Sequence, residues 1–435
     1  MSSPVSMDDA IGRLLDQPLD PAHKALPPLD APLTLGAVHA QGWHALDGDL
    51  PWPLMLLKEA ALEHNLRLMA AFCRRNGLEL APHGKTTMAP QLVQRQIANG
   101  AWGVTAATPS QARLFHRFGV RRLLLANQLV DPVGAGWAVR AVATDPKLEL
   151  YCLVDSVAGV QRLDRLVARA STAAILPVLL ELGVKGQRAG CRTEDEALAV
   201  ADAVAGSASL HLAGLEAFEG VIGSDREPET LAAVDGFLSQ LVVVAEALME
   251  AEAFASRDEV IVTVGGSAFP DRVATVLGPT WTPPQPTKRI LRSGCYLTHD
   301  HGLYARASPF GEQAEADAGR LRPAIEVWGG VLSRPEPDLV IAGFGKRDVP
   351  YDAGMPRPIV IRDGAGRMRT PEPQLTVSGL NDQHAFVHVP ADDALAVGDL
   401  IGCGISHPCT AFDKWSLVPL VDDDYRVTGA IRTFF

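Results

Sequence analysis

One lysine, Lys85, lies at a position where the sequence predicts burial, and burying an ammonium group costs free energy. Lys85 lies in the run Leu80-Ala81-Pro82-His83-Gly84-Lys85-Thr86-Thr87, which reads as the end of a buried strand followed by a tight turn and a helix. Burial at the rim of a core disfavours an ammonium group and favours the neutral amine. A neutral amine is a nucleophile that can form an imine with an aldehyde cofactor. Lys85 is therefore a candidate for covalent attachment of a cofactor, although a lysine at a strand end is more often a surface residue.

Two glycine-containing runs could hold a phosphate group. Val262-Thr263-Val264-Gly265-Gly266-Ser267 is an apolar strand that ends in two glycines and a hydroxyl, just before a predicted helix. Glycines let backbone amides approach a phosphate, and a helix N-terminus adds a favourable dipole. A second run, Leu291-Arg292-Ser293-Gly294-Cys295-Tyr296, offers another glycine amide and a tyrosine ring. The best candidate for an aldehyde cofactor is pyridoxal phosphate, which carries a phosphate. The alternative for the first run is an ordinary strand-to-helix turn, which uses the same residues.

An arginine follows another predicted strand. Arg188 lies in Gln187-Arg188-Ala189-Gly190, after a strand that ends near Glu181. Its guanidinium group could donate a planar fork of hydrogen bonds to the phenolic oxygen of a pyridine ring or to a substrate carboxylate. The alternative is a solvated loop arginine.

A histidine and a cysteine near the C-terminus form a candidate metal site. His407 and Cys409 lie two residues apart in Ser406-His407-Pro408-Cys409, so in an extended chain both side chains point to one face. Imidazole and thiolate together favour zinc and leave positions open for water or substrate. The spacing alone fits a structural histidine beside a buried cysteine better. Residues 381–384, Asn-Asp-Gln-His, supply further polar groups that could support these ligands.

The elements that must position these residues follow a βαβ rhythm from about residue 53 to residue 267. Eight apolar segments are predicted strands: 53–57, 78–82, 103–107, 122–126, 148–154, 175–181, 212–218 and 260–265. Eight parallel strands close a (β/α)8 TIM-type barrel, whose chemistry sits at the C-terminal strand ends. The residues that fall there are Lys85, Thr108, Asn127, Asp155, Arg188, Glu219, Gly265 and Gly266. An open doubly wound sheet, the alternative, would lack one shared mouth.

A second domain is predicted after the barrel, because short alternating runs separated by Pro and Gly replace the helical periodicity after about residue 302. Five runs look like strands of an antiparallel β-domain: 324–332, 338–342, 358–361, 384–389 and 416–419. We therefore expect a flexible N-terminal segment (1–32), a barrel (46–305), and a β-domain built from 306–435 with 33–45 packed against it.

Composition excludes several classes of protein. Among 435 residues, 47% are hydrophobic, which supports full folding, and the net charge of −12 argues against nucleic acid or anionic membrane as partners. We find no apolar run of membrane length and no secretion signal. The six cysteines are scattered without paired spacing, which favours a reducing cytoplasm.

Together these motifs resemble the D-threonine aldolase and D-serine dehydratase family, whose members bind pyridoxal phosphate in an alanine-racemase-like barrel. The resemblance spans about residues 54–421. It implies that Lys85 is the Schiff-base lysine, that His83 and Arg188 are cofactor neighbours, and that His407 and Cys409 bind the metal. The implied phosphate site comprises Gly265, Gly266, Ser267, Gly294, Cys295 and Tyr296.

Some positions depart from the family pattern, which suggests a diverged substrate pocket. Glu181-Leu182-Gly183 stands where an Asp-x-Gly is usual, and Phe218-Glu219-Gly220 replaces a tyrosine or histidine. Gln383-His384-Ala385 replaces Glu-His-Gly near the metal.

The resemblance implies a lyase that uses pyridoxal phosphate and a divalent metal, zinc or manganese. Cys409 favours the dehydratase branch, because the aldolases carry a carboxylate there. That branch converts a β-hydroxy D-amino acid such as D-serine to a 2-oxo acid and ammonia. The alternatives are retro-aldol cleavage to glycine and an aldehyde, or a cofactor-binding protein without turnover, although the latter are usually bare barrels of about half this length. The resemblance also implies a homodimer in which the β-domain of one chain closes the barrel mouth of the other.

Overall fold

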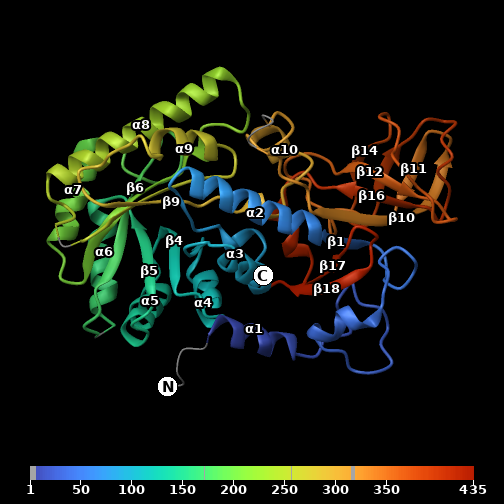
Figure 1. The fold of residues 1–435 in the computed structure, drawn as a ribbon, viewed down its shortest axis with the longest axis horizontal. Helices are drawn as coiled ribbons and strands as arrows, with labels where there is room; N and C mark the ends of the chain where they lie inside the picture. The colour runs from blue at the N-terminus through green and yellow to red at the C-terminus, as the bar shows by residue number, and fades with distance from the viewer. Residues whose placement is uncertain (1–5, 171, 256, 315–318) are drawn as a thin grey trace.

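The computed structural model describes residues 6–170, 172–255, 257–314 and 319–435. It contains an eight-stranded parallel sheet and a ten-stranded, mostly antiparallel sheet. Figure 1 shows the parallel sheet with its helices on one side of the molecule and the second sheet on the other. The (β/α)8 barrel and the C-terminal antiparallel β-domain predicted from the sequence are both present.

The parallel sheet has the order β2-β9-β8-β7-β6-β5-β4-β3. Its strands are β2 (Glu79–Leu80), β3 (Val104–Ala106), β4 (Arg122–Gln128), β5 (Glu149–Val154), β6 (Leu176–Leu182), β7 (Leu210–Ala217), β8 (Val260–Val264) and β9 (Thr287–Leu291). The two ends of this order meet, because Trp102 N donates to Leu80 O (2.7 Å) and Thr105 N donates to Pro82 O (3.0 Å). The strands therefore curl into a barrel.

Two apolar layers explain why these strands read as nearly continuous hydrophobic runs. Inside the barrel lies a small cluster that includes Trp102, Tyr151 and Leu179, and the opposite strand faces join a larger core under the helices. The covering helices are α2 (Glu59–Arg75), α3 (Pro90–Ala98), α4 (Pro109–Arg117), α5 (Pro132–Thr144), α6 (Val157–Ala168), α7 (Glu194–Ala205), α8 (Pro228–Glu250) and α9 (Pro270–Leu277).

Helix α8 is, within the described part of the chain, the one helix long and apolar enough to cross a membrane by length and composition. One of its faces packs into the core through residues such as Phe237, Leu238 and Leu241. It also contacts α7 and α9, as a barrel-covering helix does.

The second sheet has the order β13-β12-β16-β10-β1-β17-β18, with β11, β15 and β14 branching from β10. Its strands are β1 (Leu54–Lys58), β10 (Ile325–Glu336), β11 (Leu339–Ala342), β12 (Arg357–Arg362), β13 (Met368–Arg369), β14 (Thr376–Leu380), β15 (Ala385–His388), β16 (Leu400–Gly404), β17 (Leu417–Val421) and β18 (Val427–Arg432).

The prediction that segment 53–57 is the first barrel strand was wrong. This segment, β1, pairs with β10 and β17 in the second sheet, beside the C-terminal strands (Figure 1). The remaining barrel strand is β9, whose first three residues are only half-buried. An apolar pattern indicates a buried strand but not the sheet to which the strand belongs.

The N-terminal segment also differs from the flexible stretch expected for residues 1–32. Residues 1–5 lie outside the described part, but helix α1 (Met7–Leu15) buries Ala10, Ile11 and Leu14. Further along, Trp43 O accepts from Val427 N (2.9 Å), which joins segment 33–45 to β18. The 3₁₀ turn η1 (Leu35–Gln41) also packs on β18.

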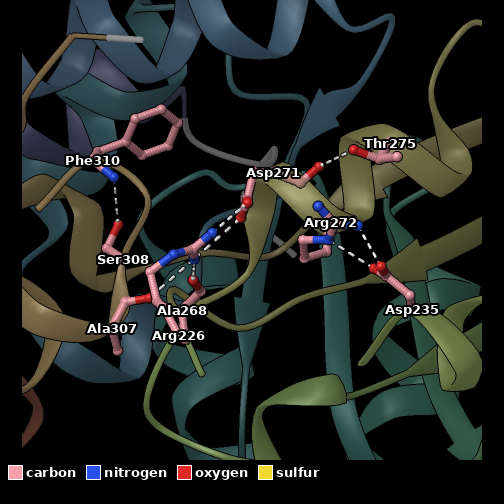
Figure 2. Close-up of polar contacts among 9 residues, drawn as sticks. All are labelled: Arg226, Asp235, Ala268, Asp271, Arg272, Thr275, Ala307, Ser308 and Phe310. Atoms are coloured by element: carbon pink, nitrogen blue, oxygen red, sulfur yellow. Dashed lines mark hydrogen bonds and ion pairs between the residues drawn. The ribbon is translucent and has the colours of Figure 1, made fainter. Parts of the chain in front are cut away.

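One arginine holds together the elements that follow the predicted phosphate loop. Arg226 donates to Asp271 Oδ2 in α9 (2.6 Å), to Ala268 O (3.2 Å) and to Ala307 O (3.3 Å) in α10 (Leu303–Ala307), as Figure 2 shows. Arg272 pairs with Asp235 and so joins α9 to α8. These contacts fix the backbone directly after Gly265-Gly266-Ser267.

Candidate active site

A cavity of about 230 Å³ opens at the C-terminal ends of the barrel strands. Residues singled out in the sequence line it, among them His83, Lys85, Glu181, Arg188 and Gly265. They come from the ends of β2, β6 and β8, which the barrel brings to one mouth. The expectation of a single shared mouth is therefore met for these residues.

Lys85 lies in the 3₁₀ turn η2 (Gly84–Thr86), between β2 and α3, and its half-buried side chain faces the cavity. His83 lies beside it, and its buried Nδ1 atom has no hydrogen-bond partner. Burial, together with the charges of Lys85 and Arg292, lowers the pKa of His83 well below its usual value. A neutral imidazole with a free polar atom therefore borders the space next to the lysine.

The two glycine runs lie against each other, as expected for a site built from two sides. Ser293 Oγ donates to Gly266 O (2.6 Å), and Cys295 N donates to Ser267 Oγ (3.1 Å). Gly265 has a φ of +136°, a conformation that side chains disfavour. A Cβ on Gly294 would lie 2.6 Å from His83 O, so only glycine allows the second loop to approach the lysine turn.

Two residues that depart from the family pattern also border the cavity. Phe218 follows β7, and the guanidinium carbon of Arg188 lies 4.5 Å from its ring centroid. Glu181 accepts a hydrogen bond from Gln128, and burial raises the pKa of Glu181. Glu219, which follows Phe218, accepts a hydrogen bond from Gly266 N (2.9 Å) and so supports the glycine loop.

An ion pair that the sequence did not reveal forms part of the cavity wall. Arg292 pairs with Glu216 and donates to Thr263 Oγ1 (3.1 Å) and Ala217 O (3.0 Å). Burial raises the pKa of Glu216 to about 7, although Arg292 opposes that rise. The pair lies nearly inaccessible to solvent, where each partner depends on the other.

The ring of Tyr296 does not face the cavity, whereas its backbone lies in the same turn as Cys295. Its ring lies in the core, its hydroxyl accepts from Gln96 Nε2 of α3 (3.2 Å), and it does not line the cavity. Residues 295–297 form the 3₁₀ turn η4, in which neighbouring side chains point about 120° apart. The Cys295 side chain points toward Cys409, and the Tyr296 side chain therefore points in a different direction, into the core.

Cys295 instead joins the two residues predicted to bind metal. Its Sγ lies 3.4 Å from Cys409 Sγ, and one ligand atom each from Cys295, His407 and Cys409 lie within 4.8 Å of one another. Thr86, next to Lys85, places its Oγ1 atom 3.3 Å from Cys409 Sγ. The cluster therefore contacts the turn that carries Lys85.

Asp352 orients His407, a role that sequence analysis had given to residues 381–384. Asp352 Oδ2 lies 2.7 Å from His407 Nδ1, and Thr410 Oγ1 donates to Asp352 Oδ1 (2.7 Å). Gln383 instead donates to Asp348 (3.0 Å). Asp352 lies far from His407 in sequence, so no local spacing could have indicated it.

These contacts also shift the pKa values of Cys409 and His407 in opposite directions. A hydrogen bond from Cys295, with others from His407 and Thr86, lowers the pKa of the Cys409 thiol well below its usual value despite burial. Burial lowers the pKa of His407, but the hydrogen bonds to Cys409 and Asp352 outweigh it and raise that pKa to about 9. Cys409 is therefore readily available as a thiolate.

Comparison with known proteins identifies both domains. A model described as "Alanine racemase, N-terminal domain" matches residues 57–267, and one described as "Putative serine dehydratase domain" matches residues 324–421. A D-threonine aldolase from Arthrobacter sp is 25% identical over 373 residues, which cover 85% of this chain and 89% of that protein. The chain therefore carries both of these domains and is similar to the D-threonine aldolase and D-serine dehydratase family.

Solved structures of that family share the fold. The D-threonine aldolase from Filomicrobium marinum matches with a TM-score of 0.74 and 23% identity, covering 88% of this chain and 95% of that one. The D-threo-3-hydroxyaspartate dehydratase from Delftia sp. HT23 matches with a TM-score of 0.69 and 20% identity, covering 88% and 98%. A metal-free form of such a dehydratase is also known.

The residues of this chain fit the cofactor of the family. The buried Nδ1 of His83 is left without a partner beside Lys85. Gly294 lets the second glycine loop approach the lysine turn. The cysteine and histidine donors likewise fit a divalent metal, because Asp352 holds Nδ1 and leaves His407 Nε2 for coordination.

Proposed function

We propose that this chain is a dehydratase that uses pyridoxal phosphate and a divalent metal to convert a β-hydroxy D-amino acid, such as D-serine, to a 2-oxo acid and ammonia. The observation that carries the proposal is the contact of Thr86, beside Lys85, with Cys409. It places a candidate metal pair next to the lysine that would hold the cofactor. A metal there could act on the hydroxyl of a substrate whose α-carbon faces Lys85.

On the lysine side, the chain supplies attachment and a base. Pyridoxal phosphate, when bound, would supply an electron sink for the charge released at the substrate α-carbon. The amine of Lys85 would hold the cofactor and then take the α-proton. Arg188, at the cavity wall beside Phe218, could donate to the cofactor's phenolic oxygen or to the substrate carboxylate. Ser293 and Ser267 join the two glycine loops, which would border the phosphate from two sides.

On the other side, His407 and Cys409 would hold the metal. A divalent metal supplies Lewis acidity that helps a β-hydroxyl leave. Asp352 keeps Nδ1 of His407 occupied and fixes the imidazole orientation. A thiolate at Cys409, rather than the carboxylate of the aldolases, supports elimination of the hydroxyl over cleavage of the carbon–carbon bond.

Retro-aldol cleavage to glycine and an aldehyde is the second candidate, favoured by the relative from Arthrobacter sp, which is a D-threonine aldolase. The β-domain with its cysteine and histidine cluster supports an enzyme rather than a cofactor-binding protein without turnover. We further propose a cytoplasmic homodimer; the unpaired state of all six cysteines is compatible with a reducing compartment.

Metal removal tests the proposed function. Ammonia release from D-serine by the holoenzyme should stop after treatment with a chelator and return on addition of zinc, while the visible absorbance of the lysine-bound cofactor persists. The Cys409→Ala variant should behave like the chelated enzyme. Ammonia release that survives complete metal removal would contradict a metal-dependent elimination.

A further inference from the structure

Cys295 differs from Cys403 and Cys152, two buried cysteines of the protein core. Cys403 and Cys152 lie inside apolar clusters in the interior of strands β16 and β5. The Cys295 thiol is also buried, with 5% of the residue exposed, but its contacts are polar. They are Cys409 Sγ (3.4 Å), Thr86 Oγ1 (3.8 Å) and the hydroxyl of Tyr304. Packing alone therefore does not account for a cysteine at this position.

We propose that Cys295 is a third protein ligand of the metal, which gives a Cys₂His site that selects zinc over manganese. The inference rests on the proposed function only in that a metal binds at His407 and Cys409. The structure places the Sγ atom of Cys295 within 4.8 Å of one ligand atom from each of those two residues. The sequence motif around Cys295 had indicated a phosphate contact, and its backbone amide still faces Ser267.

The separation of the two sulfur atoms supports shared coordination. Two thiolates about 2.3 Å from a tetrahedral zinc ion lie roughly 3.8 Å apart. The distance of 3.4 Å between the Cys295 and Cys409 Sγ atoms needs only a small adjustment to reach that value. A disulfide would require a much larger one, because its sulfur atoms lie about 2.05 Å apart.

The backbone around Cys295 holds the thiol in that direction. Its N–H group donates to Ser267 Oγ (3.1 Å), and the preceding Gly294 lies against His83 O, where a Cβ would come within 2.6 Å. The loop that carries the third ligand is therefore the loop that lies beside the lysine turn. Metal binding and cofactor binding would stabilise the same backbone.

The donor set determines which metal binds. Two thiolates and one imidazole are soft ligands that suit zinc, whereas manganese prefers carboxylate, carbonyl and water oxygen. Three protein ligands in a tetrahedral site leave one open position, as in catalytic zinc sites. That position would accept the β-hydroxyl oxygen of the substrate.

X-ray absorption at the zinc edge of the zinc-loaded holoenzyme tests this assignment, because it counts sulfur neighbours without depending on turnover or on cofactor absorbance. We expect two sulfur atoms at about 2.3 Å in the wild type, one in Cys295→Ala, and two in the control Cys403→Ala. Zinc should outcompete equimolar manganese in the wild type, and this preference should weaken in Cys295→Ala.

A single sulfur neighbour in the wild type would overturn the proposal, even if Cys295→Ala does not fold. Unchanged sulfur counts in a folded Cys295→Ala variant would overturn it as well. Two sulfur neighbours in an enzyme that releases no ammonia would support the third ligand and contradict the proposed function instead. The two claims therefore fail separately.

Discussion

Asp352 determines which nitrogen of His407 can bind a metal. Its carboxylate lies 2.7 Å from Nδ1 and is itself held by Thr410, so Nε2 is the nitrogen left for a metal. A histidine without such a partner can rotate and change tautomer, which weakens its binding of metal. Asp352 therefore supports metal binding by fixing the orientation of His407.

Replacing Asp352 by asparagine should weaken zinc binding about 10- to 100-fold, because His407 loses the carboxylate that orients it and raises its basicity. Competition with a chromophoric chelator measures the dissociation constant. Asp413→Asn, which removes a half-exposed carboxylate paired with Lys414, is the matched control and should leave zinc affinity unchanged. Equal affinities in the two variants would show that Asp352 does not support the metal ligand.

Lys85→Ala should abolish both the visible absorbance of the bound cofactor and product formation, because the amine is the attachment point and the base. Zinc stoichiometry should stay unchanged, since none of the three candidate ligands is Lys85. Lys147→Ala, at an exposed position before β5, serves as the control. A Lys85→Ala variant that keeps the absorbance would remove the lysine from the account.

At the scale of elements, the active site depends on how closely three turns approach one another. The turns after β2, β8 and β9 carry Lys85, Gly266 and Cys295, and hydrogen bonds through Ser293 and Ser267 join the last two. Arg226 fixes the chain that follows the β8 turn (Figure 2). The approach of the β9 turn to the lysine turn requires glycine at position 294.

Gly294→Ala should therefore push the β9 turn away from His83, destabilise the protein by about 1–3 kcal/mol and weaken cofactor binding. Gly12→Ala is the control, since a Cβ there meets no atom within 4 Å and alanine is the better helix former. Thermal unfolding and cofactor titration of both variants provide the readout. A Gly294→Ala variant as stable as the wild type would mean that the two turns need not lie so close.

The elements also show what the sequence could and could not predict. Strand ends at Lys85, Arg188 and Gly265 were correctly expected at one mouth, because alternating strands and helices dictate a parallel barrel. The segment that forms β1 was assigned to the wrong sheet, and the ring of Tyr296 was expected near the barrel mouth but lies in the core. Sheet membership and the direction of a side chain in a tight turn depend on contacts between distant residues. For the same reason, the sequence did not indicate the contact of Asp352 with His407 or that of the Cys295 thiol with Cys409.

At the scale of the whole molecule, the two sheets and the N-terminal segment form a continuous core. Helix α1 buries Ile11 and Leu14, and Gln94 of α3 donates to Asp8 (2.6 Å). Strand β1 enters the β-domain before the barrel begins, so the chain crosses between the two sheets twice. This arrangement holds the β-domain, which carries His407, against the barrel mouth, which carries Lys85.

Leu14→Ala should lower the free energy of unfolding by about 2–5 kcal/mol, because a side chain with 1% exposure is truncated. The control Val133→Ala changes a residue with 75% exposure and should shift stability by less than about 0.5 kcal/mol. Denaturant unfolding of both variants tests the prediction. Equal stabilities would show that the N-terminal helix does not contribute to the core.

The most direct test of the central claim is a product analysis with D-serine, D-threonine and D-threo-3-hydroxyaspartate, and with their L-enantiomers, with and without chelator. The proposed dehydratase predicts ammonia and a 2-oxo acid from at least one D-enantiomer, and neither product in the presence of chelator. Glycine and an aldehyde, without ammonia, would contradict the proposal and assign the chain to retro-aldol cleavage.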